Sequence, residues 1–497
     1  MPSNVTNLTH STSLALGWVY VGAIARLILG FGTGVVLARI LGPKPFGEIA
    51  VATLLFGLGN ILSGLGVTSA LIQKPEISQR DIRICFTSQF FVGSLISVLL
   101  FFSAPVWAIF FRQPELRVVL IALAPIFLFQ SLGTTATALL SRAQNTRPIQ
   151  LAQIISYSFA YCVVAVPMAF LGFGVWSLVA AYLVQAILNS ALLYLTSRHS
   201  VHLLVDRDGI ALIRFGIYVL VTNICNWGIS NLDNTVVGRF SGQVSLGLYS
   251  RAFNFAQMPA DLIVGNLQAV MLPAFSRVQD DQARLARVYL ALFGLVVLIL
   301  LSPFLAMATV PDIVISGLYG VKWSGAIPLF RPLALALPVH ALMALAGPTL
   351  WSRGKPRIEL WIQLSVLLLA IPAFILSINT SLVCLAWTVM GLYCVRFLLM
   401  THTVLRELGV EWKRLIGVAV PGLLLATVAA TFALLTSFAL PHAPAPIRLL
   451  VVAVSSCTLT LVVAFVARRH IFDPILRDTP QIRDILYSRV GRIKQYF

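Results

Sequence analysis

The chain alternates long apolar runs with short polar breaks along almost its whole length. Each run reaches the roughly 20 residues that a helix needs to cross a bilayer. Backbone groups in hydrocarbon must be hydrogen-bonded within their own segment, so these runs predict helices. With Gly, Pro and charged residues taken as breaks, fourteen helices are predicted, near 14–39, 46–72, 84–111, 118–141, 149–171, 175–197, 212–238, 245–276, 286–309, 326–350, 358–378, 380–404, 414–438 and 446–467.

Composition agrees with a chain dissolved in lipid. Of the 497 residues, 59% are hydrophobic and 10% are charged, whereas a soluble domain has about 25% charged residues. We therefore predict an all-α polytopic membrane protein. The six cysteines lie in apolar segments without metal-ligand spacing, so we interpret them as small hydrophobic residues and expect no metal and no cofactor.

The basic residues indicate an orientation rather than a nucleic-acid partner. The net charge is +18, but Lys and Arg are spread through short loops. With an inside N-terminus, 24 of the 35 basic residues fall on the inner side and 7 on the outer side. This asymmetry is typical of a membrane protein with both termini in the cytoplasm.

An internal repeat appears at an offset of 200 residues. Its matched positions are Val36, Arg39, Gly42, Gly47 and Ala52, against Val236, Arg239, Gly242, Gly247 and Ala252. Parallel repeats are common in transporters. They predict two six-helix bundles, 1–205 and 206–408, followed by two extra helices at 409–470. A basic amphipathic tail at 471–497 is expected to lie on the inner leaflet.

Polar side chains follow one face of the seventh and eighth predicted helices. The expected cavity lining comprises Asn223, Asn226, Asp233, Asn254, Gln257 and Gln268. The alternative is hydrogen bonding between helices, which Asn and Gln commonly supply in membranes. Asp261 is a candidate for proton or ion coupling, because a carboxyl group inside a membrane is costly and usually functional.

Three arginines inside spans suit an anionic substrate. Arg26 lies near the middle of the first helix, and Arg251 and Arg331 lie inside the eighth and tenth. A guanidinium group binds phosphate oxygens in a bidentate manner. The alternative is an ion pair with Asp233 or Asp261. Arg396 is expected to reach the inner interface and is given no role.

Several motifs resemble the polysaccharide transporter family of Wzx-type flippases, in the superfamily that also holds multidrug exporters and lipid II flippases. The motifs are Ala38–Pro43 with Phe46–Gly47, Asp233–Arg239, Gly247–Ala252, Tyr319–Gly320 with Lys322–Trp323, and Gly354–Pro356.

The resemblance implies a fold like that of multidrug exporters of the MATE type. It also implies a substrate of oligosaccharide on undecaprenyl diphosphate, moved to the periplasmic face of the bacterial inner membrane for polysaccharide biosynthesis. A polysaccharide polymerase is then an expected partner, and Arg26, Arg251 and Arg331 fit a cation-lined cavity.

Two other functions stay open from the sequence. A multidrug exporter of the same fold would not need several arginines inside the membrane. A membrane polymerase or glycosyltransferase usually has a large outer loop with catalytic acids, but the longest outer connection, near 310–325, carries only Asp312. We find no phosphate-binding or nucleophile motif and expect no enzymatic activity.

Overall fold

The computed structural model describes residues 3–63, 71, 77–204, 224, 227–276, 281–439 and 441–467, and these residues form helices and short connections without a strand. The predicted all-α class is confirmed. Large apolar side chains face outward, as in Phe102, Ile109 and Leu461, which are 72%, 76% and 64% exposed. An apolar surface of this kind suits lipid rather than water.

Twelve helices in the described ranges are long and apolar enough to cross a membrane, and they lie at twelve of the predicted positions. The other two predictions are 212–238, of which only 224 and 227–238 are described, and 245–276, which coincides with α11 (Gly242–Ser276). The number of fourteen therefore remains a prediction. The tail at 471–497 lies outside the described residues.

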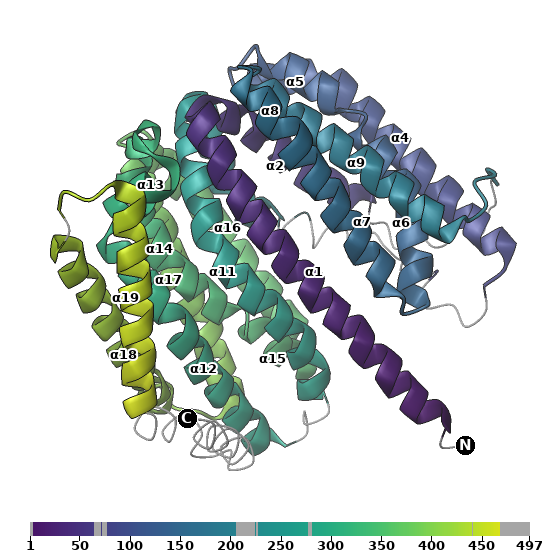
Figure 1. The fold of residues 1–497 in the computed structure, drawn as a ribbon. Helices are drawn as coiled ribbons and strands as arrows, with labels where there is room; N and C mark the ends of the chain where they lie inside the picture. The colour runs from purple at the N-terminus through teal and green to yellow at the C-terminus, as the bar shows by residue number, and fades with distance from the viewer. Residues whose placement is uncertain are drawn as a thin grey trace, which may run out of the picture. The chain divides into compact units, whose positions relative to one another are not determined.

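The chain forms two compact units, Met1–Gly247 and Leu248–Phe497, with the boundary inside α11. The domain boundaries expected at 205, 408 and 470 remain predictions. In the first unit, α1 lies along α7, and α6 packs against both α4 and α9 (Figure 1). The helices described between residues 3 and 197 are α1 (Ser3–Leu41), α2 (Pro43–Ser63), α4 (Gln79–Phe110), α5 (Leu116–Leu123), α6 (Ile126–Arg142), α7 (Thr146–Ser158), the π-helical η1 (Phe159–Ala165), α8 (Val166–Phe170) and α9 (Val175–Ser197), and residues 227–240 are helical as well.

In the second unit, α12 packs along α18, and α17 packs against α14 and α16. Its helices after α11 are α12 (Gln282–Thr309), α13 (Pro311–Tyr319), the short η2 (Val321–Ala326), α14 (Ile327–Met343), α15 (Ala346–Ser352), α16 (Pro356–Ile378), α17 (Leu382–Leu408), α18 (Trp412–Ala439) and α19 (Ala445–Val466).

The repeat found in the sequence has matching backbone geometry in the first unit. Gly42, between α1 and α2, and Gly242, the first residue of α11, have φ of 76° and 80°, a conformation that glycine adopts without steric cost. Gly47 and Gly247 lie at a reciprocal contact. A Cβ atom on Gly47 would come within 1.8 Å of the carbonyl oxygen of Gln243, and one on Gly247 within 2.0 Å of that of Pro43. Equivalent positions of the two copies thus make equivalent contacts.

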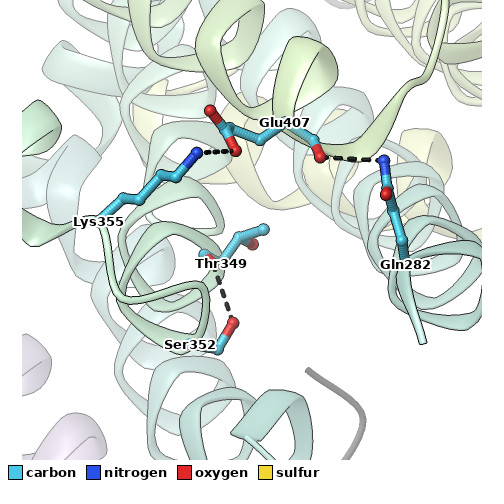
Figure 2. A network of polar contacts seen from close by, with 5 residues as sticks. All are labelled: Gln282, Thr349, Ser352, Lys355 and Glu407. Atoms are coloured by element: carbon cyan, nitrogen blue, oxygen red, sulfur yellow. Dashed lines mark hydrogen bonds and ion pairs between the residues drawn. The ribbon is translucent and has the colours of Figure 1, made fainter. Parts of the chain in front are cut away.

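A polar network connects three segments at one end of the second unit (Figure 2). Lys355, before α16, forms an ion pair of 2.6 Å with Glu407 near the end of α17. The side-chain amide of Gln282, at the start of α12, donates to the backbone carbonyl of Glu407 at 3.1 Å. The Gly354–Pro356 motif is therefore connected through Lys355 to α17, and α17 is connected in turn to α12.

Candidate functional site

The α1–α7 interface carries a line of polar and aromatic contacts through the first unit. On α7, Gln150, Gln153 and Tyr157 are three and four residues apart, a spacing that places them on one helix face. The hydroxyl groups of Tyr157 and Thr33 are 3.0 Å apart. At the other end of the line, the Arg147 guanidinium lies 5.1 Å from the centre of the Trp18 ring. The face of α7 with these residues therefore packs on α1.

Arg26 lies in the middle of this line. Its Nη1 donates to Oε1 of Gln150 and, at 2.6 Å, to Oε1 of Gln153. Arginine only donates hydrogen bonds, so both amides must present their oxygen atoms to it. The interaction leaves Nε and Nη2 of Arg26 without a hydrogen bond among the described residues.

The charge of Arg26 is not cancelled by its neighbours. Within the described ranges its hydrogen-bond partners are two neutral amides, and no carboxylate forms an ion pair with it. The expected alternative, an ion pair with Asp233 or Asp261, is not seen in this part of the chain. A half-buried cation with only neutral partners is suited to binding an anion.

Arg396 has a different environment from Arg26, and its reach to the membrane interface stays a prediction. Its Nη2 donates to Oε1 of Gln363 at 2.6 Å, and Nε2 of Gln363 donates to Oε1 of Glu359 at 3.0 Å. Gln363 is 7% exposed. The arginine is thus linked through a buried amide to an acid, which is how a charge inside a membrane protein is usually satisfied.

Arg251 contacts α13, the helix that follows α12, and Arg331 contacts the end of α12. The Arg251 guanidinium lies 5.0 Å from the centre of the Tyr319 ring, a cation–π distance, and Tyr319 packs on the fully buried Trp323. Arg331 is exposed, and its Nε donates to the carbonyl of Ala308 at 3.0 Å. That carbonyl is among the last four of α12, which have no partner within the helix.

The predicted polar lining is described only in part. Asn223, Asn226 and the side chain of Gln268 lie outside the described residues. Asp233 is buried, and its Oδ1 accepts from the backbone N–H of Asn234 at 2.7 Å. On α11, Nε2 of Gln257 donates to Oδ1 of Asp261 at 3.3 Å. Asn254 and Asp261 are exposed.

Sequence reasoning singled out Arg26 but missed its partners. Gln150 and Gln153 are two amides in an otherwise apolar span, which is the signal that could have drawn attention to them. Gly22 was missed because an isolated glycine in a membrane helix is common. The structure shows its use: a Cβ atom there would lie 2.1 Å from Oε1 of Gln150.

A comparison with protein families shows which family the chain belongs to. The family model described as "Polysaccharide biosynthesis protein" matches residues 36–328, which is more than half of the chain. The chain belongs to the polysaccharide biosynthesis protein family. It is thus a multi-pass membrane protein of that family, and the resemblance found in the sequence is confirmed.

Relatives of this family member have roles in polysaccharide production. The chain is 28% identical over 348 residues to the succinoglycan biosynthesis transport protein ExoT of Rhizobium meliloti, with 70% of each chain covered. It is 26% identical over 350 residues to the teichuronic acid biosynthesis protein TuaB of Bacillus subtilis, covering 68% of this chain and 71% of that one. It is also 23% identical to the lipopolysaccharide biosynthesis protein WzxC of Escherichia coli, over 75% and 76% of the two chains.

Solved structures establish the fold. The lipid II flippase MurJ, in an inward closed conformation, matches with a TM-score of 0.71 at 12% identity, over 92% of this chain and 99% of that one. An inward-facing MATE family multidrug transporter matches with a TM-score of 0.61 at 15% identity, over 80% and 99%. The expected MATE-like fold is confirmed.

Proposed function

We propose that this protein is a flippase that moves undecaprenyl-diphosphate-linked oligosaccharide units from the cytoplasmic to the periplasmic face of the inner membrane, by alternating access between its two bundles. The names of its relatives connect the family to polysaccharide transport and biosynthesis. The observation that carries the proposal is Arg26, a cation inside a membrane helix whose described partners are two neutral amides.

A diphosphate is the substrate chemistry that matches this arrangement. Keeping a charged group inside a membrane costs several kcal/mol, and neutral amides recover only part of that. The Nε and Nη2 edge of Arg26, which bonds to none of the described residues, can donate two parallel hydrogen bonds to phosphate oxygens. A cationic drug would be repelled by the same group, which argues against the multidrug-exporter alternative.

The other residues predicted from the sequence have supporting roles in this proposal. Arg251 and Arg331 would contact the diphosphate or the acidic groups of the sugar at other stages of transport. The side chains lining the pathway would be Asn223, Asn226, Asp233, Asn254, Gln257 and Gln268. Asp261 would be the candidate for ion or proton coupling, since it is an exposed acid hydrogen-bonded to Gln257.

The orientation and the partners belong to the same proposal. The excess of basic residues on one side supports cytoplasmic termini in the bacterial inner membrane. A polysaccharide polymerase would receive the flipped units on the periplasmic face. The protein itself would move its substrate without making or breaking a covalent bond.

Replacing Arg26 tests the proposal in cells. A strain that depends on this protein for polysaccharide export should lose at least about tenfold of its export with Arg26→Ala, because charge-assisted hydrogen bonds are lost. Lipid-linked oligosaccharide should accumulate at the same time. Arg26→Lys should restore only part of the export, since an ammonium group lacks the planar fork.

Arg117→Ala is a matched control, because Arg117 is exposed in the first turn of α5 and should tolerate the change. Membrane abundance is measured for every variant. Full export by Arg26→Ala at normal abundance would contradict the proposal.

A further inference from the structure

We infer that Gln150 and Gln153 are positioning residues, which fix the Arg26 guanidinium while leaving its positive charge available to an anion. This inference rests on the proposed function, because it assigns the anion to the diphosphate of the substrate. It concerns two amides on α7 and the glycine opposite them on α1.

The type of acceptor determines whether Arg26 keeps its net charge. An amide oxygen accepts the same hydrogen bond as a carboxylate oxygen but adds no net charge. With Glu at either position, Arg26 would sit in an ion pair and would attract a phosphate more weakly. With a methylene chain there, the guanidinium would lose its orientation. Two amides at hydrogen-bond distance from one nitrogen give orientation without neutralisation.

The same protein contains a contrasting arginine. Arg396 also donates to a glutamine, Gln363, but that amide passes a hydrogen bond on to Glu359. The amides that hold Arg26 are not linked to an acid by any hydrogen bond among the described residues. Glutamine acceptors therefore have two different roles in this protein. In the second unit, Gln363 links Arg396 to an acid, whereas in the first unit Gln150 and Gln153 bind Arg26 without linking it to a described acid.

The geometry of the guanidinium group determines which of its nitrogens can bind an anion. Nη1 takes both amides, so Nε and Nη2 are left on the edge of the group that α7 does not occupy. These two nitrogens are the donors that bind a phosphate side-on. The positioned edge is thus complementary to a group with several anionic oxygens.

Gly22 is the third part of the arrangement. A Cβ atom at this position would lie 2.1 Å from Oε1 of Gln150 and 2.9 Å from its Cβ. Any other residue would therefore push the Gln150 side chain away from Arg26. Above and below, the Trp18–Arg147 and Thr33–Tyr157 contacts fix the register of α1 on α7. Gly22 gives the buried Gln150 the room to reach the guanidinium.

The experiment compares two substitutions of Gln153 in the full-length protein, purified in lipid nanodiscs. The probe is undecaprenyl diphosphate without sugar, and both its affinity and the thermal stability of the protein are measured. Gln153→Glu should weaken binding by about tenfold, because a carboxylate neutralises Arg26, while thermal stability stays the same or rises. Gln153→Met should weaken binding less, although it loses the hydrogen bond and is less stable.

The two variants are thus expected to rank in opposite order by affinity and by thermal stability, and this distinguishes positioning from a merely structural role. A structural role predicts that Gln153→Glu, which keeps the hydrogen bond, binds better than Gln153→Met, and that order would overturn the inference. Wild-type affinity in Gln153→Glu would overturn it too. Gln79→Glu, in the exposed first turn of α4, controls for an added charge and should bind like wild type.

Gly22→Ala and Arg26→Ala complete the set. Gly22→Ala should lower affinity through displacement of Gln150, and it provides the test if Gln153→Glu does not fold; wild-type affinity in this variant would contradict the inference. Arg26→Ala separates the two proposals. If Arg26→Ala binds the diphosphate as wild type does, the proposed function of Arg26 is contradicted. If Arg26→Ala loses affinity but the Gln153 and Gly22 variants do not show their expected losses, only the positioning role is contradicted.

Discussion

Among individual residues, His199 shows how burial changes the pKa of a side chain in this protein. It lies in the connection after α9 and is 6% exposed. The rings of Phe86 and Tyr194 lie 5.5 and 5.4 Å from its imidazole. This burial lowers the pKa of His199 from its ordinary value of 6.5, against a smaller opposite effect from the carbonyl of Ser200. The folded protein therefore favours the neutral imidazole.

Stability should consequently depend on pH in a defined direction. The unfolded chain binds a proton at His199 more readily than the folded chain does. The contribution of the neutral His199 to the free energy of unfolding is thus complete above about pH 6.5. It is lost as pH falls from there through the lowered pKa of His199. Thermal unfolding of the purified protein between pH 7.5 and 5 checks this. His199→Phe should flatten the decline, and an unchanged decline would assign it to other groups.

At the scale of helices, close packing in the second unit depends on single glycines. Gly422 of α18 faces α12, where an added Cβ atom would lie 2.8 Å from Cγ1 of Val297 and 3.0 Å from the backbone nitrogen of Leu298. Gly417, five residues earlier in the same helix, has no heavy atom within 4 Å of such a Cβ. The two positions therefore separate the packing role of glycine from its helix propensity.

The same substitution should have opposite effects at these two positions. Gly422→Ala should destabilise the protein by about 1–3 kcal/mol, because α18 must shift away from the backbone of α12. Gly417→Ala should be neutral or slightly stabilising, since alanine favours a helix more than glycine does. Thermal unfolding in detergent measures both. Equal effects would show that α12 and α18 are not packed as described.

The helices themselves could be predicted well from apolar run length, but their internal breaks could not. Twelve candidate spans overlap the predicted ranges. The π-helical segment Phe159–Ala165 was missed, because an apolar run carries no signal for a change of helix type. The connection near 310–325 was expected as a loop, yet it contains α13, and Trp323 is fully buried. Burial of that ring depends on contacts with Tyr319 and the rest of the unit.

For the whole molecule, the sequence predicted the class of protein and the position of Arg26 in a span, but it did not predict the residues that bind Arg26. The partners Gln150 and Gln153 are 124 and 127 residues away in the sequence. Their meeting depends on how α1 and α7 pair, which the periodicity of neither helix specifies. Likewise, the place of Arg396 in its span gave no sign of the hydrogen bonds that link it through the buried Gln363 to Glu359.

The central claim is that this chain moves diphosphate-linked oligosaccharide across a membrane with the help of Arg26. Flipping can be measured directly with the purified protein in liposomes, using a fluorescent undecaprenyl-diphosphate oligosaccharide and a quencher that does not cross the bilayer. Wild-type protein should make the inner-leaflet label accessible far faster than protein-free liposomes, and Arg26→Ala should return the rate close to that background. Equal rates for wild type and protein-free liposomes, or for wild type and Arg26→Ala, would contradict the account.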